Sequence, residues 1–300
     1  MEFRPIAIPD RELVRRCRAE DPHEASDYAF TYHYPFVDIP RTETRIAESS
    51  GCVIFRWNED GGFRYFFPLG GGDKRKALAE LRDHCRRQGI RLRVSSMSAD
   101  EAAFLQDSLP GKWIVRANRD EFDYVYRMRD LADLPGRRYQ SRRSFVNRFM
   151  SCGDWGYEPI AEGNVDDCRT VLRRWQEAKV ADGKPFPETL AEEAVATLRI
   201  LDDYFALGLV GGVLRRCGEP VAFAIGERLT RDMTLLAYEK ALPSVCGAFQ
   251  TGDREFVRLC CADSAFVNRS WDEGMEGLRL MKTIYHPMRM IEKWVAEEAG

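Results

Sequence analysis

The sequence predicts an α/β (α+β) fold made of two lobes, each a mixed, mostly antiparallel sheet flanked by helices. The chain has 300 residues, which is long for one compact domain and natural for two of about 150 residues each. Hydrophobic residues make up 44% and charged residues 31%, so the chain has enough apolar material for a core. Strand-like and helix-like segments also follow one another in similar orders in both halves. We therefore predict lobes at residues 1–150 and 151–300.

The first half opens with helical patterns at residues 9–20 and 25–34, and the second helix is expected to stop at Pro35. Asp73 caps a later helix, which Gly89 ends. A turn is expected at 58–62. The other predicted elements of this half, in chain order, are strands 44–47, 52–57 and 63–67, helix 73–88, strand 91–94, helix 99–105, strands 113–116 and 124–127, and a linker helix within 137–150.

The second half begins near Gly153 and has clearer periodicities. Its predicted elements, in chain order, are strand 157–161, helices 165–180 and 190–207, strands 209–215, 221–227 and 233–239, helix 249–261, strand 266–269, helix 275–284 and strand 289–295. This order resembles that of an acyltransferase domain of the GNAT type. The first half follows a less distinct version of it, so we interpret the chain as two tandem GNAT-like acyltransferase lobes.

Composition argues against several classes of protein. The net charge of −3 gives no general attraction to nucleic acid, so a polyanion would need a local basic patch. The chain has four histidines and nine irregularly spaced cysteines with no Cys-x-x-Cys pair, so it offers no metal site. The cysteine pattern is typical of reduced thiols in the cytosol. The chain opens without a signal-like apolar run, and its longest apolar stretches are only strand length. We expect a cytoplasmic protein with no metal and no transmembrane segment.

Four stretches of the sequence form a distinctive set: RDEFDYVY at 119–126, RYQSRRSFVNRF at 138–149, YEKA at 238–241 with GAFQ at 247–250, and VNR at 267–269 with GLRLMK at 277–282, Tyr285 and Pro287. This set resembles the phosphatidylglycerol lysyltransferase C-terminal family. The resemblance implies transfer of an aminoacyl group from aminoacyl-tRNA to an acceptor amine or hydroxyl, without a cofactor. The acceptor is then a lipid, a peptide or a small amine. Relatives often carry a membrane-spanning half, which we do not expect in this chain.

Two residues at the end of the predicted strand 233–239 are candidates for catalysis. In GNAT folds the fourth and fifth strands separate at this point, and the acyl group lies in the gap. Because side chains alternate along a strand, Glu239 and Lys240 point to opposite faces, so one of them is expected to face the gap. Glu239 is suited to binding or deprotonating an incoming amine. The alternative is an ion pair at a strand end.

Three further candidates follow from the resemblance. In the family, the lysine of the Gly-Leu-Arg-x-x-Lys pattern, here Lys282, belongs to the reaction centre. It is suited to stabilising negative charge on the ester carbonyl or to binding a phosphate or ribose. Asn268 and Tyr285 are candidates for orienting a carbonyl, with a buried structural role as the alternative. We predict that Glu239, Lys240, Asn268, Lys282 and Tyr285 line one cleft.

Five arginines and no acidic residue lie between residues 137 and 148. A basic helix of this kind can bind a tRNA backbone, since phosphate contacts provide most of the affinity for nucleic acids. We place it at the rim of the cleft. The alternative is a solvated helix face whose arginines pair with acidic residues of the other lobe. The predicted substrate- and tRNA-binding residues are Arg138, Arg142, Arg143, Arg148, Gln250, Arg269 and Arg279. The last three of these are predicted from the resemblance.

The segment after the predicted strand 233–239 departs from the GNAT enzymes that use acetyl-CoA. Those enzymes have a Gln/Arg-x-x-Gly-x-Gly/Ala loop there, whereas residues 241–248 lack the Gln or Arg, and Pro243 removes an amide donor. Coenzyme A is therefore a less favoured donor than aminoacyl-tRNA. Three hypotheses stay open: an aminoacyl-tRNA-dependent transferase, a coenzyme A-dependent N-acyltransferase, and a non-catalytic binding protein.

Overall fold

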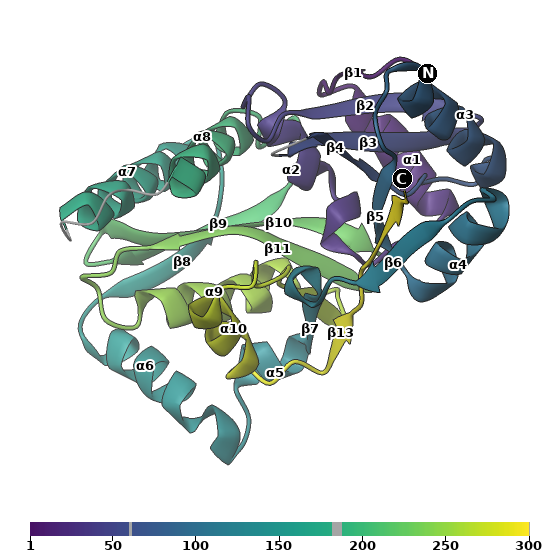
Figure 1. Cartoon of the computed structure of the whole chain (residues 1–300). Coiled ribbons are helices and arrows are strands. Elements are labelled where there is room, and N and C mark those ends of the chain that lie inside the picture. The colour runs from purple at the N-terminus through teal and green to yellow at the C-terminus, as the bar shows by residue number, and fades with distance from the viewer. Residues whose placement is uncertain (60–61, 182–187, 300) are drawn as a thin grey trace. The chain divides into compact units, whose positions relative to one another are not determined.

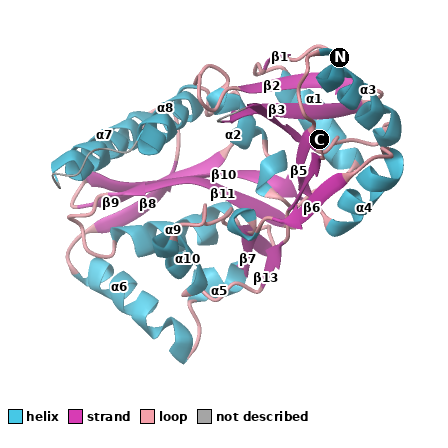
Figure 2. Ribbon diagram, in the orientation of Figure 1, coloured by secondary structure: helices cyan, strands magenta, loops and turns pink. Residues whose placement is uncertain are grey.

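The computed structural model describes residues 1–59, 62–181 and 188–299 (Figure 1). The chain forms two compact units, one of residues 1–124, 270–280 and 290 onward, the other of residues 125–269 and 281–289. Each is a mixed sheet with flanking helices, which confirms the predicted fold class (Figure 2). The limits of these units do not coincide with the ranges 1–150 and 151–300.

The first unit contains a seven-stranded sheet in the order β1-β2-β3-β4-β5-β14-β6. The pairing of β4 with β5 is parallel, and the other pairings are antiparallel. The strands are β1 (Arg4–Pro5), β2 (Thr44–Ser49), β3 (Cys52–Glu59), β4 (Gly62–Phe66), β5 (Arg93–Met97), β6 (Trp113–Ala117) and β14 (Trp294–Glu298). The helices in this part of the chain are α1 (Asp10–Glu20), η1 (Ser26–Tyr28), α2 (Phe30–His33), η2 (Tyr34–Phe36), α3 (Lys74–Arg87), α4 (Ala99–Ser108) and η3 (Arg119–Glu121).

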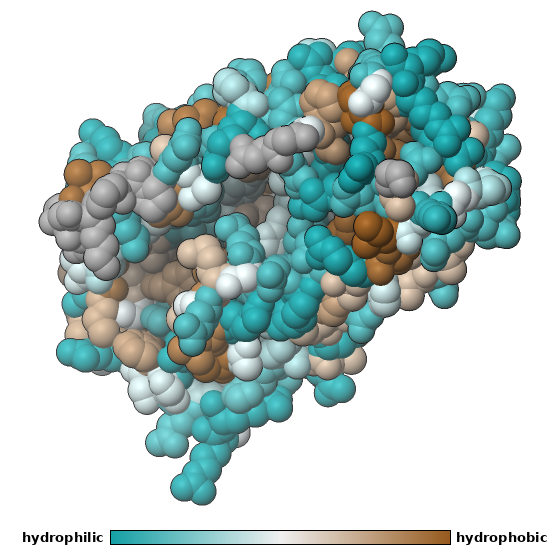
Figure 3. Space-filling view, in the orientation of Figure 1, coloured by the Kyte–Doolittle hydropathy of each residue, from teal (hydrophilic) through white to brown (hydrophobic). Residues whose placement is uncertain are grey.

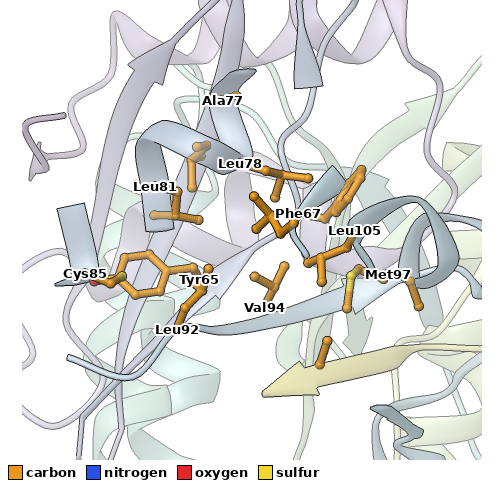
Figure 4. Close-up of a cluster of buried hydrophobic side chains, with 14 of the residues drawn as sticks. Tyr65, Phe67, Ala77, Leu78, Leu81, Cys85, Leu92, Val94, Met97 and Leu105 are labelled. Atoms are coloured by element: carbon orange, nitrogen blue, oxygen red, sulfur yellow. The ribbon is translucent and has the colours of Figure 1, made fainter. Parts of the chain in front are cut away.

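Helices α3 and α4 bury their apolar faces against this sheet (Figure 4). Leu78 and Leu81 of α3 and Leu105 of α4 pack with Tyr65 of β4 and Val94 of β5, all without solvent exposure. Ala296 of β14 belongs to the same cluster. The last strand of the chain therefore completes the core of the first unit.

The second sheet has the order β13-β7-β12-β11-β10-β9-β8. Helix α7 contacts one face of it and α9 packs on the other, where α6 lies against α9 (Figure 2). The strands are β7 (Asp123–Arg127), β8 (Trp155–Pro159), β9 (Val210–Arg216), β10 (Glu219–Thr230), β11 (Met233–Ala241), β12 (Phe266–Asn268) and β13 (Arg289–Ile291). The helices in this part of the chain are α5 (Met128–Asp133), η4 (Arg137–Tyr139), α6 (Gln140–Ser151), α7 (Val165–Ala181), α8 (Glu188–Asp202), α9 (Ala248–Cys260) and α10 (Glu276–Thr283), and residues 276–280 of α10 belong to the first unit.

The two sheets exchange strands between the halves of the chain. Strand β7 from the first half joins the second sheet beside β12, and β14 from the second half joins the first sheet between β5 and β6. The predicted strand 289–295 is therefore two strands, β13 and β14, which separate at Glu292–Lys293 and belong to different sheets.

The predicted helix 25–34 is also divided, into η1, α2 and η2. Ala25 and Ala29 have extended backbones, with ψ angles of 136° and 141°. The backbone amide of Ser26 donates to Asp123 Oδ2 at 2.6 Å, so a tertiary contact replaces the helical pattern here. Part of the predicted turn at 58–62 lies outside the described residues, because residues 60 and 61 are not among them.

Candidate active site

Strands β11 and β12 pair in parallel over a short length and then separate. Their register runs from Met233 opposite Phe266 to Leu235 opposite Asn268, and β11 continues to Ala241. Glu239 lies on this extension of β11, and Arg269 directly follows β12. A small pocket at this place has room for about one water molecule, and its lining includes Glu239, Lys240 and Asp253. The described side chains around it belong to the second unit.

Arg269 joins two carboxylates at the separation. Its guanidinium donates to Glu239 Oε1 at 2.8 Å and to Asp253 Oδ2 at 3.0 Å. It also lies over the ring of Tyr285, 4.9 Å from the centroid. Only 7% of the residue is exposed. Arg269 was predicted to bind substrate, but in the structure its donors hold Glu239 and Asp253 in place.

Asp253, on the buried face of α9, was not predicted from the sequence. Burial raises the pKa of this carboxyl to about 6 against the opposing effect of Arg269. Its Oδ1 atom and the Tyr285 hydroxyl are both buried, and the hydroxyl lies close enough to the carboxyl to hydrogen-bond to it and lower its pKa. The two side chains are 3% and 2% exposed. Buried polar groups are usually paired, and these two pair with each other at the place where the strands separate.

Lys282 and Tyr285 come from α10 and the turn that follows it. The Lys282 ammonium donates to the backbone carbonyl of Arg269, and the Lys282 carbonyl accepts from the Tyr126 hydroxyl at 2.7 Å. Burial, and then the nearby Asp253, raise the pKa of Tyr285. The structure thus brings Glu239, Lys282 and Tyr285 together around Arg269.

Lys240 has a different set of neighbours. Its ammonium binds Glu193 Oε1 of α8 at 2.6 Å and lies 4.9 Å from the ring centroid of Trp175 on α7. Because it alternates with Glu239 along β11, its charged end faces these helices rather than Arg269. Asn268 is fully buried on β12, next to Arg269 in sequence, and its backbone is in register with Leu235 and Val125.

The arginines of η4 and α6 have unequal roles. The Arg142 guanidinium lies 5.7 Å from the Tyr285 ring centroid, which places it beside the cluster. Arg148 is exposed on α6, where hydrophilic side chains cover the surface (Figure 3). Arg138 pairs with Asp130 at 3.1 Å, and Arg143 donates to the carbonyls of Leu134 and Gly136. Arg138 and Arg143 therefore have intramolecular partners.

Gln250 and Arg279 are the last two predicted binding residues. Gln250 is half-buried in the first turn of α9. Arg279 belongs to the first unit, where it pairs with Asp120 at 2.7 Å and with the fully buried Asp272 at 3.0 Å. After the cost of its burial, the bonds from Arg279 and Tyr124 bring the pKa of Asp272 down to about 2, which indicates a structural ion pair.

Two kinds of feature are absent from the described residues. No group of three or more His, Cys, Asp or Glu side chains is placed to hold a metal ion there. In the same residues no helix combines the length and the apolarity needed to cross a bilayer.

The sequence profile described as phosphatidylglycerol lysyltransferase, C-terminal, matches residues 19–297. No curated protein matches the sequence. A conserved protein of unknown function from Bacteroides thetaiotaomicron has a similar structure, with a TM-score of 0.90, 27% identity and full coverage of both chains.

Two of the other similar structures have the following descriptions. One is L-PGS from Bacillus licheniformis, with a TM-score of 0.66, 15% identity, and coverage of 97% of this chain and 92% of that one. The other is the C-terminal domain of a putative lysylphosphatidylglycerol synthetase from Agrobacterium fabrum, with a TM-score of 0.64, 15% identity and coverage of 98% and 93%. At these identities the likeness concerns the fold.

Proposed function

Because the chain belongs to the phosphatidylglycerol lysyltransferase C-terminal family and has its acyltransferase fold, we propose that it transfers an aminoacyl group from aminoacyl-tRNA to an acceptor amine or hydroxyl. The observation that supports this most is a pair of buried groups beside Arg269, the Asp253 carboxyl and the Tyr285 hydroxyl, which interact with each other. They lie where β11 and β12 separate, and they suit the amino and carbonyl groups of an aminoacyl ester.

Asp253 is suited to move the proton in the proposed reaction. The acceptor nitrogen or oxygen attacks the ester carbonyl carbon, and its proton passes to Asp253 Oδ1. The bond from that carbon to the ribose oxygen then breaks, and Asp253 returns the proton to the ribose. A carboxyl group with a pKa of about 6 works in both directions near neutral pH.

The neighbouring side chains complete the proposed centre. Lys282 supplies positive charge to the ester oxygen as it becomes negative. Glu239, held by Arg269 and partly exposed, is placed to bind the ammonium group of the aminoacyl donor or of the acceptor. Tyr285 donates a hydrogen bond to the carbonyl.

The basic helix α6 supports tRNA as the carrier of the acyl group. Arg142 lies over Tyr285 beside the centre, and Arg148 extends the positive surface along the helix. Phosphates of the tRNA acceptor end are the groups that these side chains fit. Of the five arginines in this region, Arg142 and Arg148 are the two that we assign to the RNA.

The loop before α9 favours a donor other than coenzyme A. Leu242 and Val245 of this loop pack on a cluster that includes Phe149 of α6. A Cβ atom at Gly247 would lie only 2.4 Å from the carbonyl oxygen of Phe145. Helix α6 therefore covers the segment whose amides would have to bind the pyrophosphate of coenzyme A.

A transfer assay with two donors tests the proposal. The donors are total tRNA charged with labelled amino acids, and labelled acetyl-CoA. The acceptors are phosphatidylglycerol vesicles, chosen for the family's description, and a small diamine. We expect label to move to an acceptor from aminoacyl-tRNA and not from acetyl-CoA. Transfer from acetyl-CoA alone would favour the N-acyltransferase, and binding of aminoacyl-tRNA without any transfer would favour a non-catalytic binding protein.

A further inference from the structure

Two exposed cysteines of the second unit lie in neighbouring turns. Of the cysteines in the described chain, Cys152, Cys217 and Cys246 are exposed, and the others are buried or half-buried. Cys152 follows the last turn of α6, and Cys217 lies in the turn between β9 and β10. These two turns meet at the end of the β8–β9 ladder.

The register of the ladder places Cys217 beside the segment that follows Cys152. Trp155 of β8 is opposite Arg216 of β9, and the next backbone bond runs from the Cys217 amide to the Asp154 carbonyl at 2.7 Å. The Cys217 sulfur lies 3.3 Å from the position that a Cβ on Gly153 would occupy. The Arg216 guanidinium donates to the Cys152 carbonyl at 3.1 Å. Cys217 therefore lies against the residue that follows Cys152 in the chain.

Cys152 and Gly153 lie in the connection between α6 and β8. The φ angle of Gly153 is +117°, a conformation that side-chain-bearing residues rarely adopt, and residues 152 and 153 form a bend outside the helix and the strand. Because Cys152 lies outside the helix and the strand, a shift of this bend toward Cys217 would leave both regular elements in place. A disulfide needs Cα atoms within about 7 Å of each other.

We infer that Cys152 and Cys217 form a reversible disulfide by exchange with a small-molecule disulfide such as glutathione disulfide. One protein thiolate attacks the oxidant's S–S bond and releases a glutathione thiol, leaving a mixed disulfide. The second protein thiolate then attacks the protein sulfur and releases the second glutathione. The two protein thiols lose two electrons and two protons, and the oxidant is reduced to two thiols.

The bond would tie the end of the basic helix α6 to the β9–β10 turn. It closes a loop of about 65 residues, and loops of that length gain stability because the unfolded chain is restricted. We therefore expect the oxidised protein to have a higher Tm than the reduced protein, and dithiothreitol to reverse the difference.

Peptide mapping of the full-length protein tests the inference. The folded protein is incubated with glutathione disulfide, alkylated, digested without reduction and analysed by mass spectrometry. The expected product is one cross-linked pair of peptides that contain Cys152 and Cys217. Cys152→Ser and Cys217→Ser should each abolish it, and Cys246→Ser, which removes the third exposed thiol, should leave it unchanged. Glutathione found separately on Cys152 and Cys217, or a bond to Cys246 instead, would overturn the inference.

Discussion

Asp253 carries a cost in stability that the proposed chemistry explains. Its carboxyl group is buried on α9 and shares the single guanidinium of Arg269 with Glu239. Burial raises its pKa from 3.8 to about 6. A group with a raised folded-state pKa contributes its stability fully below the unfolded pKa and loses it as the pH rises through the folded pKa. For Asp253 that window lies between about pH 4 and pH 6.

The substitution Asp253→Asn should therefore remove one pH-dependent part of the folding free energy. Between pH 4 and pH 6 the parent should lose on the order of 3 kcal/mol more stability than the variant, because one pKa unit corresponds to about 1.4 kcal/mol. Urea unfolding of both proteins across this range measures the difference. Parallel curves for the two proteins would show that Asp253 has an ordinary pKa.

Lys293 is a second buried charge, at the point where the chain enters β14. Its ammonium pairs with Asp27 and with Asp123 at 2.7 Å, and it lies 4.1 Å from the ring centroid of Trp271. Burial raises the pKa of Asp27, although Lys293 opposes the change. This cluster joins segments that are far apart in the sequence and fixes the start of the strand that completes the first sheet.

Lys293→Met should leave two buried carboxylates without their cation. Removing one partner of a buried pair typically costs about 3–5 kcal/mol. Urea unfolding at neutral pH measures the loss, with the exposed Lys112→Met as the matched control. Adding Asp27→Asn and Asp123→Asn to the variant should recover part of the loss. A loss no larger than that of the control would contradict the structural role of the cluster.

Helix α6 is the element on which RNA binding depends in the proposed function. The double substitution Arg142→Ala with Arg148→Ala should weaken tRNA binding. It should also make the fall of log K with log salt less steep by about 1.5, since each phosphate contact contributes about 0.7–0.9 to that slope. Filter binding at several salt concentrations gives the slope. Arg16→Ala with Arg87→Ala, two exposed arginines of the first unit, is the control. Equal slopes in the parent and the α6 variant would remove these arginines from the tRNA site.

At the scale of the whole molecule, the order of helices and strands was predictable, because hydrophobic periodicity and capping residues such as Asp73 are local signals. The exchange of β7 and β14 between the sheets was not predictable. For example, one short apolar run, at 289–295, supplies strands to both sheets. Strand partners depend on tertiary packing, which leaves no periodic trace in the sequence.

The candidate site was predictable only in part, because local signals identify some of its residues and tertiary packing decides the roles of the others. The end of β11 and Lys282 follow from motif and topology, but the roles of Arg269 and Arg143 depend on which carboxylates and carbonyls fold against them. Asp253 did leave one signal, an acidic residue on the buried stripe of a predicted helix. Such a residue is rarely buried without a reason.

The central claim is that the cluster where β11 and β12 separate performs acyl transfer. The most direct test is the single-turnover rate at which label leaves aminoacyl-tRNA in the presence of acceptor. Asp253→Asn and Lys282→Ala should each lower this rate by about 100-fold or more, the usual contribution of a positioned acid–base or charge-stabilising group, with unchanged circular dichroism. The exposed Asp202→Asn should transfer at the parent rate. Parent-like rates in Asp253→Asn and Lys282→Ala would contradict the claim.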